Sequence, residues 1–316
     1  MERYCQKIIA SVRQDEIVAA AGKILPPGTT IETAWNREAD VFPHDYAALC
    51  MDAEQPGERL KYYLKVLAEM NPKEWGTETH VSVHNFFIRL SDIIKRKYFP
   101  LIDAFIQWID NTFPNIPVVT FRGGMESVEH AFRAKGRRVL PLWITARILE
   151  QYTPRDDVIQ KHFIERGVTI DLIAREADRL LIADTGLQGR AIKFAYEVLR
   201  ESVDSDEAAV RRVEERVFGR LMCGYPETYG PPLYSLYPRL FTLLTPQGGQ
   251  MVEFERFPRS SKSATHLVQI GGHTEPIHIV WKNDAKYLID YPDARTALDA
   301  WCMNVLVIRH FLGQTA

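Results

Sequence analysis

The chain predicts an α/β fold with a central parallel sheet, because short apolar runs alternate with helical stripes along its middle. Val118-Val-Thr-Phe121 precedes a helical stretch over Met125 to Lys135. Leu180 to Ala183 precedes a second stretch over Ala191 to Leu199, in which four residues recur at helical spacing: Ile192, Ala195, Tyr196 and Leu199. Strands that alternate with helices form parallel sheets through right-handed crossovers.

Composition limits the class of protein. A length of 316 residues indicates two or three units, and 46% hydrophobic with 25% charged residues is an ordinary globular composition. The net charge of −2 supplies no basic field, so nucleic acid is not an expected partner. No apolar run approaches ~18 residues, which argues against a membrane partner. We expect a cytoplasmic protein with scattered reduced thiols, at Cys5, Cys50, Cys223 and Cys302.

Residues 1–113 predict a helical N-terminal region. The expected helices cover residues 2–23, Glu58 to Met70, His84 to Phe99 and Pro100 to Phe113. Pro100 divides the last two, because proline is favoured in the first turn of a helix. The segment 114–117 is too short and too stiff for a flexible linker, so this region should pack against the sheet.

Residues 114–245 predict the α/β domain. Its further expected elements are a strand over Arg138 to Ile144, a helix over Asp156 to Arg166, a strand over Val168 to Ile173, a charged helix over Ser205 to Leu221 and an irregular connection over Cys223 to Pro246. Pro141 restricts its strand to an edge or an irregular position, because proline cannot donate to a sheet ladder.

Residues 246–316 predict a C-terminal β-rich part that a helix closes. Alternating patterns indicate strands over Met251 to Phe257, Thr265 to Ile270, Pro276 to Trp281 and Tyr287 to Ile289. The closing helix is expected over Ala294 to Leu312.

The segment Asp184-Thr-Gly-Leu-Gln-Gly-Arg190 is the first candidate site. It is polar, contains two glycines, and lies between an expected strand and an expected helix. Such a turn directs backbone N–H groups and the positive end of the helix dipole at one point, where a phosphate can bind. The alternative is a tight structural turn in which Asp184 caps the helix.

A second glycine turn, Arg122-Gly-Gly124, follows the strand at 118–121. The two turns in this order, over residues 116–202, resemble the type I phosphoribosyltransferases. The resemblance implies a central sheet of the phosphoribosyltransferase type and a phosphorylated small molecule as partner, such as phosphoribosyl pyrophosphate (PRPP), a sugar phosphate or a nucleotide. It also implies glycosyl transfer with release of pyrophosphate, and it leaves a homodimer as a possible assembly.

The resemblance also implies roles for single residues. Arg122, Gly123 and Gly124 would hold pyrophosphate, with Arg122 and Asp184 as the candidate catalytic residues. Asp184 would face the ribose or a bound Mg²⁺, the implied cofactor, since a carboxylate suits a hard divalent ion. The 5-phosphate would be wrapped by Thr185, Gly186, Gln188, Gly189 and Arg190.

The chain departs from the family pattern in three places. Ala183-Asp184 supplies one acid where the family has two, the phosphate loop is shorter, and Arg190 replaces a hydroxyl residue. A non-catalytic regulatory module that binds a nucleotide or a sugar phosphate is therefore the alternative function.

Three weaker candidates remain. His80 and His84 have helical metal-ligand spacing, but a structural pair is the more common outcome. Arg256 to Ser263 could hold a second phosphate or form a solvated hairpin loop. Three histidines could line a ligand site or be ordinary sheet residues: His266, His273 and His278.

Overall fold

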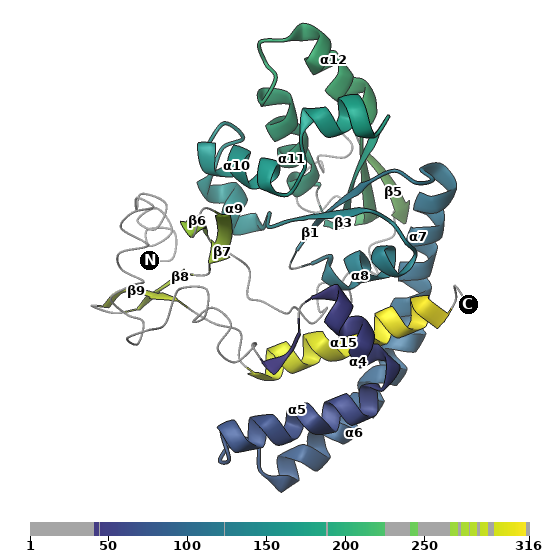
Figure 1. Ribbon diagram of the computed structural model, residues 1–316, viewed down its shortest axis with the longest axis vertical. Helices are drawn as coiled ribbons and strands as arrows, with labels where there is room; N and C mark the ends of the chain where they lie inside the picture. Colours follow the sequence, from purple (N-terminus) through teal and green to yellow (C-terminus); the bar gives the residue numbers. More distant parts are fainter. Residues whose placement is uncertain are drawn as a thin grey trace.

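The computed structural model describes residues 41–43, 45–122, 124–187, 189–224, 241–245, 266–270, 273–277, 279–282, 285–289 and 294–313. The expected helix over residues 2–23 and the expected strand over Met251 to Phe257 lie outside these residues. Helices lie on both faces of a parallel sheet, so the predicted α/β class is confirmed (Figure 1).

The central sheet contains β1 (Val118–Phe121), β2 (Val139–Leu142), β3 (Leu180–Leu187), β4 (Val217–Gly224) and β5 (Phe241–Thr245). Their order in the sheet is β2-β1-β3-β4-β5, and every pairing is parallel. Val119 of β1 is in register with Leu140 of β2 and Ile182 of β3. β2 lies at the edge, as Pro141 predicts, because an edge strand tolerates a residue without an N–H.

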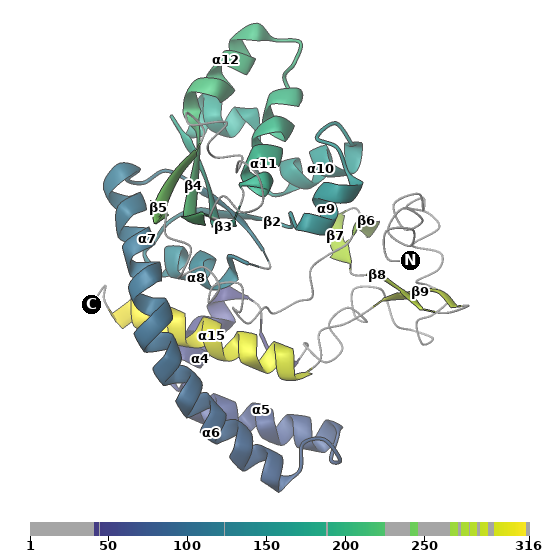
Figure 2. The same ribbon diagram turned by 180° about the vertical axis from the view of Figure 1, so that it is seen from behind.

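The helices before the sheet are α4 (Tyr46–Glu54), α5 (Pro56–Met70), α6 (Thr77–Ile93), the π-helical segment η2 (Ile94–Tyr98) and α7 (Phe99–Thr112). Pro100 lies in the first turn of α7, as predicted, but the chain stays helical through η2. A proline provides no N–H to the preceding turn, and a local change to i→i+5 bonding accommodates that loss. Figure 2 shows α6 and α7 as one long helical run.

The helices within and after the sheet are α8 (Glu126–Ala134), α9 (Ala146–Gln151), α10 (Asp157–Glu165), the π-helical segment η3 (Leu172–Glu176), α11 (Arg190–Glu201), α12 (Glu207–Arg216) and α15 (Ala294–Gly313). The strand expected over Val168 to Ile173 is wrong, because this apolar run ends in η3. Periodicity cannot separate a short buried strand from a short buried helix.

Two apolar cores lie on opposite faces of the sheet. On one face Val118, Leu181 and Ala183 pack with α7 and α8, and on the other Leu180 and Ile182 pack with α9, α10 and α11. Figures 1 and 2 show the same division, with α8 and α7 on one side of the strands and α11 on the other. Successive side chains of a strand point to opposite faces, which explains the alternation along β3.

A third core joins the first described helices to the last one. Trp301 of α15 packs between α4 and α5, and its indole donates to Asp52 Oδ2 at 2.8 Å. Asp52 also accepts from the Tyr63 hydroxyl at 2.8 Å and pairs with Arg59 at 3.0 Å. This buried carboxylate is therefore fully engaged, as burial requires. α7 packs on the sheet, so the helical region contacts it as expected, whereas the boundaries at 113 and 245 stay predictions.

The C-terminal β-rich part is not supported. Among the described residues after 245, β6 (His266–Ile270) pairs only with β7 (His273–Ile277), and β8 (Ile279–Lys282) only with β9 (Ala285–Ile289). These are two separate short hairpins, and the largest element is α15. A two-stranded hairpin alone buries too little apolar surface to form a core.

None of the helices in the described part of the chain is long and apolar enough to cross a membrane.

Candidate functional site

The strand order creates a switch point between β1 and β3. From β1 the chain moves to β2 at one edge, and it then returns to β3 on the other side of β1. The helix after β1 (α8) and the helix after β3 (α11) consequently cover opposite faces. Ligands of open α/β sheets bind outside the carboxyl ends of the strands at such a point. Both glycine turns of the sequence lie there.

The β1–α8 turn comes close to β3. A Cβ atom built on Gly124 would lie 3.3 Å from Thr185 Oγ1. That distance is tight for a real side chain, so glycine lets the β1–α8 turn approach β3. Gly124 and Thr185, which lie 61 positions apart in the sequence, are thus brought together at the switch point.

The turn before α11 is shorter than the sequence indicates. β3 continues to Leu187, so Asp184, Thr185 and Gly186 lie in the strand and not in a loop. The strand continues because β4 extends beside it, pairing Gly186 with Cys223. The polar character of these residues predicts a loop, but backbone pairing with a long neighbour decides the conformation.

Gly189 is the N-cap of α11 and adopts a left-handed conformation with φ 76°. Asp184 is therefore not the cap, and that alternative is wrong. Gly189 has no side chain with which to bond the first N–H groups of α11, and the first turn contains no acid. Arg190, the first residue of the helix, is exposed and forms no ion pair within the described residues. The helix dipole and Arg190 make this terminus electropositive, which suits an anion.

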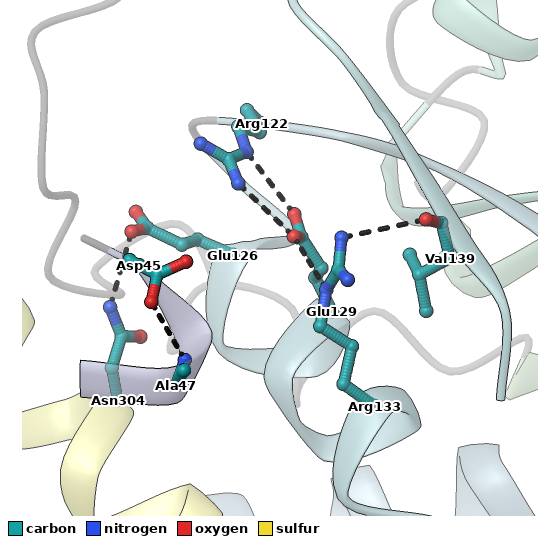
Figure 3. A network of polar contacts seen from close by, with 8 residues as sticks. All are labelled: Asp45, Ala47, Arg122, Glu126, Glu129, Arg133, Val139 and Asn304. Atoms are coloured by element: carbon teal, nitrogen blue, oxygen red, sulfur yellow. Dashed lines mark hydrogen bonds and ion pairs between the residues drawn. The ribbon is translucent and has the colours of Figure 1, made fainter. Parts of the chain in front are cut away.

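Arg122, in the β1–α8 turn, faces a buried acid of α8 (Figure 3). Its Nη2 donates to Glu129 Oε1 at 3.2 Å and its Nε to Oε2 at 3.4 Å, and Arg133 Nε donates to the same Oε1 at 3.1 Å. The guanidinium of Arg122 lies 5.8 Å from the ring centroid of Trp143, at the end of β2. The predicted pyrophosphate arginine thus has an internal anionic partner.

The two predicted catalytic residues belong to neighbouring strand ends, and side-chain alternation assigns them to different faces of the sheet. Val118 and Thr120 alternate with Val119 and Phe121, which places Arg122 on the α8 face, where it meets Glu129. Asp184 is in register with Leu221, which belongs to the core on the α11 face. The two side chains therefore start from opposite faces of the sheet.

The start of α8 contains further buried polar groups. Glu126 accepts from Asn304 Nδ2 at 3.2 Å, and Ser127 donates to Asn304 Oδ1 at 2.9 Å. His130 is buried and stacks on Tyr46 with ring centroids 5.8 Å apart, and among the described residues neither ring nitrogen has a hydrogen-bond partner. Burial lowers the pKa of His130, so the ring is neutral at neutral pH.

His162 of α10 is a buried histidine on the other face of the sheet. Its Nε2 accepts from the backbone N–H of Trp143 at 3.0 Å, which fixes the end of β2. Burial and the nearby Arg166 lower its pKa to about 3. Its neutral form is required here, because a protonated Nε2 could not accept this bond.

No sequence pattern indicated that Glu129 and Trp143 would contact Arg122. Glu129 falls within the apolar stripe of α8, between Val128 and Phe132, and an acid at such a position signals a buried partner. Gly123, Gln188, His278 and the segment Arg256 to Ser263 lie outside the described residues. His80 and His84 are on α6, His266 on β6 and an exposed His273 on β7, away from the switch point.

A surface groove at the far end of α11 is lined by charged side chains that pair with one another. Arg155 contacts Glu201 at 2.5 Å and Asp204 at 3.4 Å, and Arg200 contacts Glu214 at 3.5 Å. Arg155 and Arg200 already have carboxylate partners, so we do not take this groove as the candidate site.

No protein-family model, no curated protein and no solved structure matches the chain. The candidate site therefore depends on the geometry of the switch point.

Mg²⁺ fits this site only if a bound phosphate ligand supplies some of its oxygen ligands. Within the described part of the chain, no group of three or more His, Cys, Asp and Glu side chains could hold a metal ion. Mg²⁺ in phosphate sites binds one or two carboxylates together with substrate phosphates. Asp184, half-buried on β3, can supply one carboxylate. The donor set suits an ion that arrives with phosphates and not one held by protein alone.

Proposed function

We propose that the chain binds a phosphorylated sugar or nucleotide of the PRPP type across the switch point between β1 and β3. The N-terminus of α11 carries this proposal. It combines a left-handed Gly189, an exposed Arg190 and a first turn without acids, directly after the central strand. Backbone N–H groups and an arginine at one helix terminus are the groups that bind a phosphate dianion.

Phosphoribosyltransferase-type chemistry is the enzymatic form of the proposal. The reaction would be glycosyl transfer at an anomeric carbon: the bond from that carbon to the pyrophosphate oxygen breaks as the acceptor forms its bond. Gly124 and the neighbouring backbone would approach the leaving pyrophosphate, while the α11 terminus orients the 5-phosphate. A Mg²⁺ bound with the ligand would supply charge neutralisation on the pyrophosphate.

The first experiment measures binding. Calorimetric titration with PRPP, ribose 5-phosphate and AMP, each with and without Mg²⁺, should show binding of at least one of the three. If none binds, the proposed function is wrong.

A non-catalytic binding module is the second candidate function. Two observations favour it: Arg122 pairs with Glu129, and Arg122 and Asp184 start from opposite faces of the sheet. A phosphate could then bind at α11 while no catalytic pair assembles. Release of pyrophosphate from PRPP on turnover would exclude this candidate, and binding without release would select it.

Asp184→Asn tests the part that Mg²⁺ plays. The substitution removes a charge with almost no change in shape, so the thermal midpoint should shift little. Ligand affinity in Mg²⁺ should fall to the value measured without Mg²⁺, because the amide is a poor ligand for a hard cation. An affinity that stays Mg²⁺-dependent would remove Asp184 from the site.

A further inference from the structure

Arg220 of β4 is a buried cation that has no carboxylate partner among the described residues. The residue is 8% exposed, and burial lowers its pKa to about 10, so the guanidinium stays charged at neutral pH. Its Nη1 donates to the backbone oxygen of Gly219 at 2.8 Å. Its Nε is buried and has no hydrogen-bond partner within the described part of the chain. A buried charge with an unpaired donor is costly, so a missing partner would explain this arrangement.

Aromatic rings surround this guanidinium. Its central carbon lies 4.5 Å from the ring centroid of Phe113, 5.5 Å from that of Trp108 and 5.9 Å from that of Phe218. The rings attract the charge of a cation, but they supply no oxygen acceptor for its N–H groups. Nε and Nη2 form one edge of the guanidinium, and such an edge binds an oxyanion through two parallel hydrogen bonds.

A second buried arginine in this region already has its acid. Arg137, whose side chain is 6% exposed, donates to Asp110 at 3.1 Å. It also donates to the backbone oxygen of Phe113 at 2.8 Å, so Phe113 contacts both arginines. Within the described residues these two buried cations therefore have one carboxylate between them. One negative charge would balance the pair, whereas a dianion would leave an excess charge inside the protein.

We propose that the Nε edge of Arg220 binds a small monocarboxylate of the size of formate or acetate. A carboxylate carries the one charge that balances the two arginines, and its two oxygens match the guanidinium fork. Phe113 precedes β1 and Phe218 is the second residue of β4, so the guanidinium leans towards the amino ends of the strands, away from the switch point. The inference goes beyond the proposed function and is independent of it.

Replacing chloride by formate at constant ionic strength and neutral pH tests the proposal. A ligand that binds the folded chain raises its thermal midpoint. The midpoint should therefore rise in a saturable way, by about 3 °C when formate is well above its dissociation constant. Sulfate at the same ionic strength should give no saturable rise, because a dianion leaves an uncompensated charge.

Arg220→Met should abolish the saturable rise with formate. An apolar side chain in place of a buried charge is often neutral or stabilising, so this variant should fold. Equilibrium dialysis with labelled formate should show a site in the native chain that Arg220→Met lacks. Arg220→Lys keeps the charge but not the fork, so the dissociation constant for formate should rise roughly tenfold.

Arg179→Met is the matched control. Arg179 lies 5.8 Å from the ring centroid of Phe218, but its side chain is 50% exposed and pairs with Asp178 at 3.8 Å. This variant removes the same charge from beside the same ring and should keep the full effect of formate.

Three results would overturn the proposal. Equal losses in Arg179→Met and Arg220→Met would assign the effect to general charge. A formate effect that persists in Arg220→Met would place the anion elsewhere. A native chain that neither gains stability in formate nor retains it in dialysis would show that the aromatic rings alone suffice for Arg220.

Discussion

Two strand–turn–helix units meet at the switch point, and the charges at the N-termini of their helices differ. α8 begins with Glu126 and Glu129, both buried and both bonded to side chains of the protein. α11 begins with the exposed Arg190 after a glycine N-cap, and Lys193 follows in its first turn. The helix dipole attracts negative charge at each N-terminus. At α8 the protein supplies that charge itself, whereas the first turn of α11 contains no acid.

The difference shows that a glycine turn after a parallel strand is insufficient evidence of an anion site. Arg122-Gly-Gly124 and the turn at Gly189 look equivalent in the sequence, but only one of them leaves its arginine without an internal acid. The side chains of the first helical turn therefore show which helix terminus already has acidic side chains of the protein beside it.

The largest expected effect comes from Gly189→Val. The φ of 76° disfavours every residue with a Cβ, and most strongly a β-branched one. We expect a loss of about 2 kcal/mol in the free energy of unfolding, measured by urea denaturation, together with loss of phosphate binding. Wild-type stability in this variant would mean that the turn relaxes freely and does not define the site.

The free energy of unfolding should decrease in acid because of a buried histidine, His162. The pKa of His162 is lowered to about 3, so the unfolded chain takes up a proton near pH 6.5 while the folded chain does not. The contribution of neutral His162 is complete above pH 6.5 and is lost as the pH falls towards 3. At pH 5 the loss should be about 2 kcal/mol, from 1.36 kcal/mol for each pH unit.

His162→Gln should reduce this pH dependence, as thermal melts between pH 7 and pH 4.5 would show. The slope that remains would report on His130, on the α8 face, whose pKa burial also lowers. An unchanged slope in the variant would mean that His162 is not the titrating group.

A moderate effect is expected at Arg190. Arg190→Gln should weaken phosphate binding roughly fivefold to tenfold, the usual range for one charge-assisted contact at an exposed helix terminus. Arg200→Gln is the control, because it removes the same charge from the other end of α11, where Arg200 pairs with Glu214 at 3.5 Å. Equal losses in both variants, measured by calorimetry, would point to long-range charge and not to a site at the terminus.

The smallest effect is expected for Gly124→Ala. The added Cβ would lie 3.3 Å from Thr185 Oγ1. Because the hydroxyl can rotate away, the free energy of unfolding should fall by less than about 1 kcal/mol. Pyrophosphate affinity should decrease with it, because the β1–α8 turn must move slightly away from β3. Thr185→Ala in the same chain should restore both values by removing the contact. A failure to restore would mean that the turn and β3 are not coupled.

The elements near the switch point could be predicted from the sequence, because they follow local rules. An apolar run predicts β1 and a helical stripe predicts α8, and Pro141 predicts the edge position of β2. The expected helix over Ser205 to Leu221 is wrong beyond Arg216, because β4 begins at Val217 and contains Arg220 in mid-strand.

Arg220 is tolerated in β4 because aromatic rings surround it. Its guanidinium lies 4.5 Å from the ring centroid of Phe113 and 5.5 Å from that of Trp108, and burial lowers its pKa to about 10. Trp108 lies in α7 and Phe113 directly after it, both more than a hundred residues earlier in the chain. Only tertiary packing can stabilise such a residue in a strand, and no local pattern announces it. The pairing of Arg122 with Glu129 is similar: the spacing is visible, but the direction of each side chain is not.

The docking of α15 against the first described helices has a consequence for biosynthesis. Asp52 obtains its indole partner from Trp301, 249 positions later, and Glu126 obtains its amide partner from Asn304. At translation rates of roughly 5–20 residues per second, Asp52 waits about 12 to 50 seconds for that partner. During this interval α4 and α5 expose an unfinished apolar surface on the nascent chain, where chaperones can bind. Packing of this region therefore cannot be completed before Trp301 has been synthesised, and a truncation that removes Trp301 should destabilise α4 and α5 first, although they lie far away in the sequence.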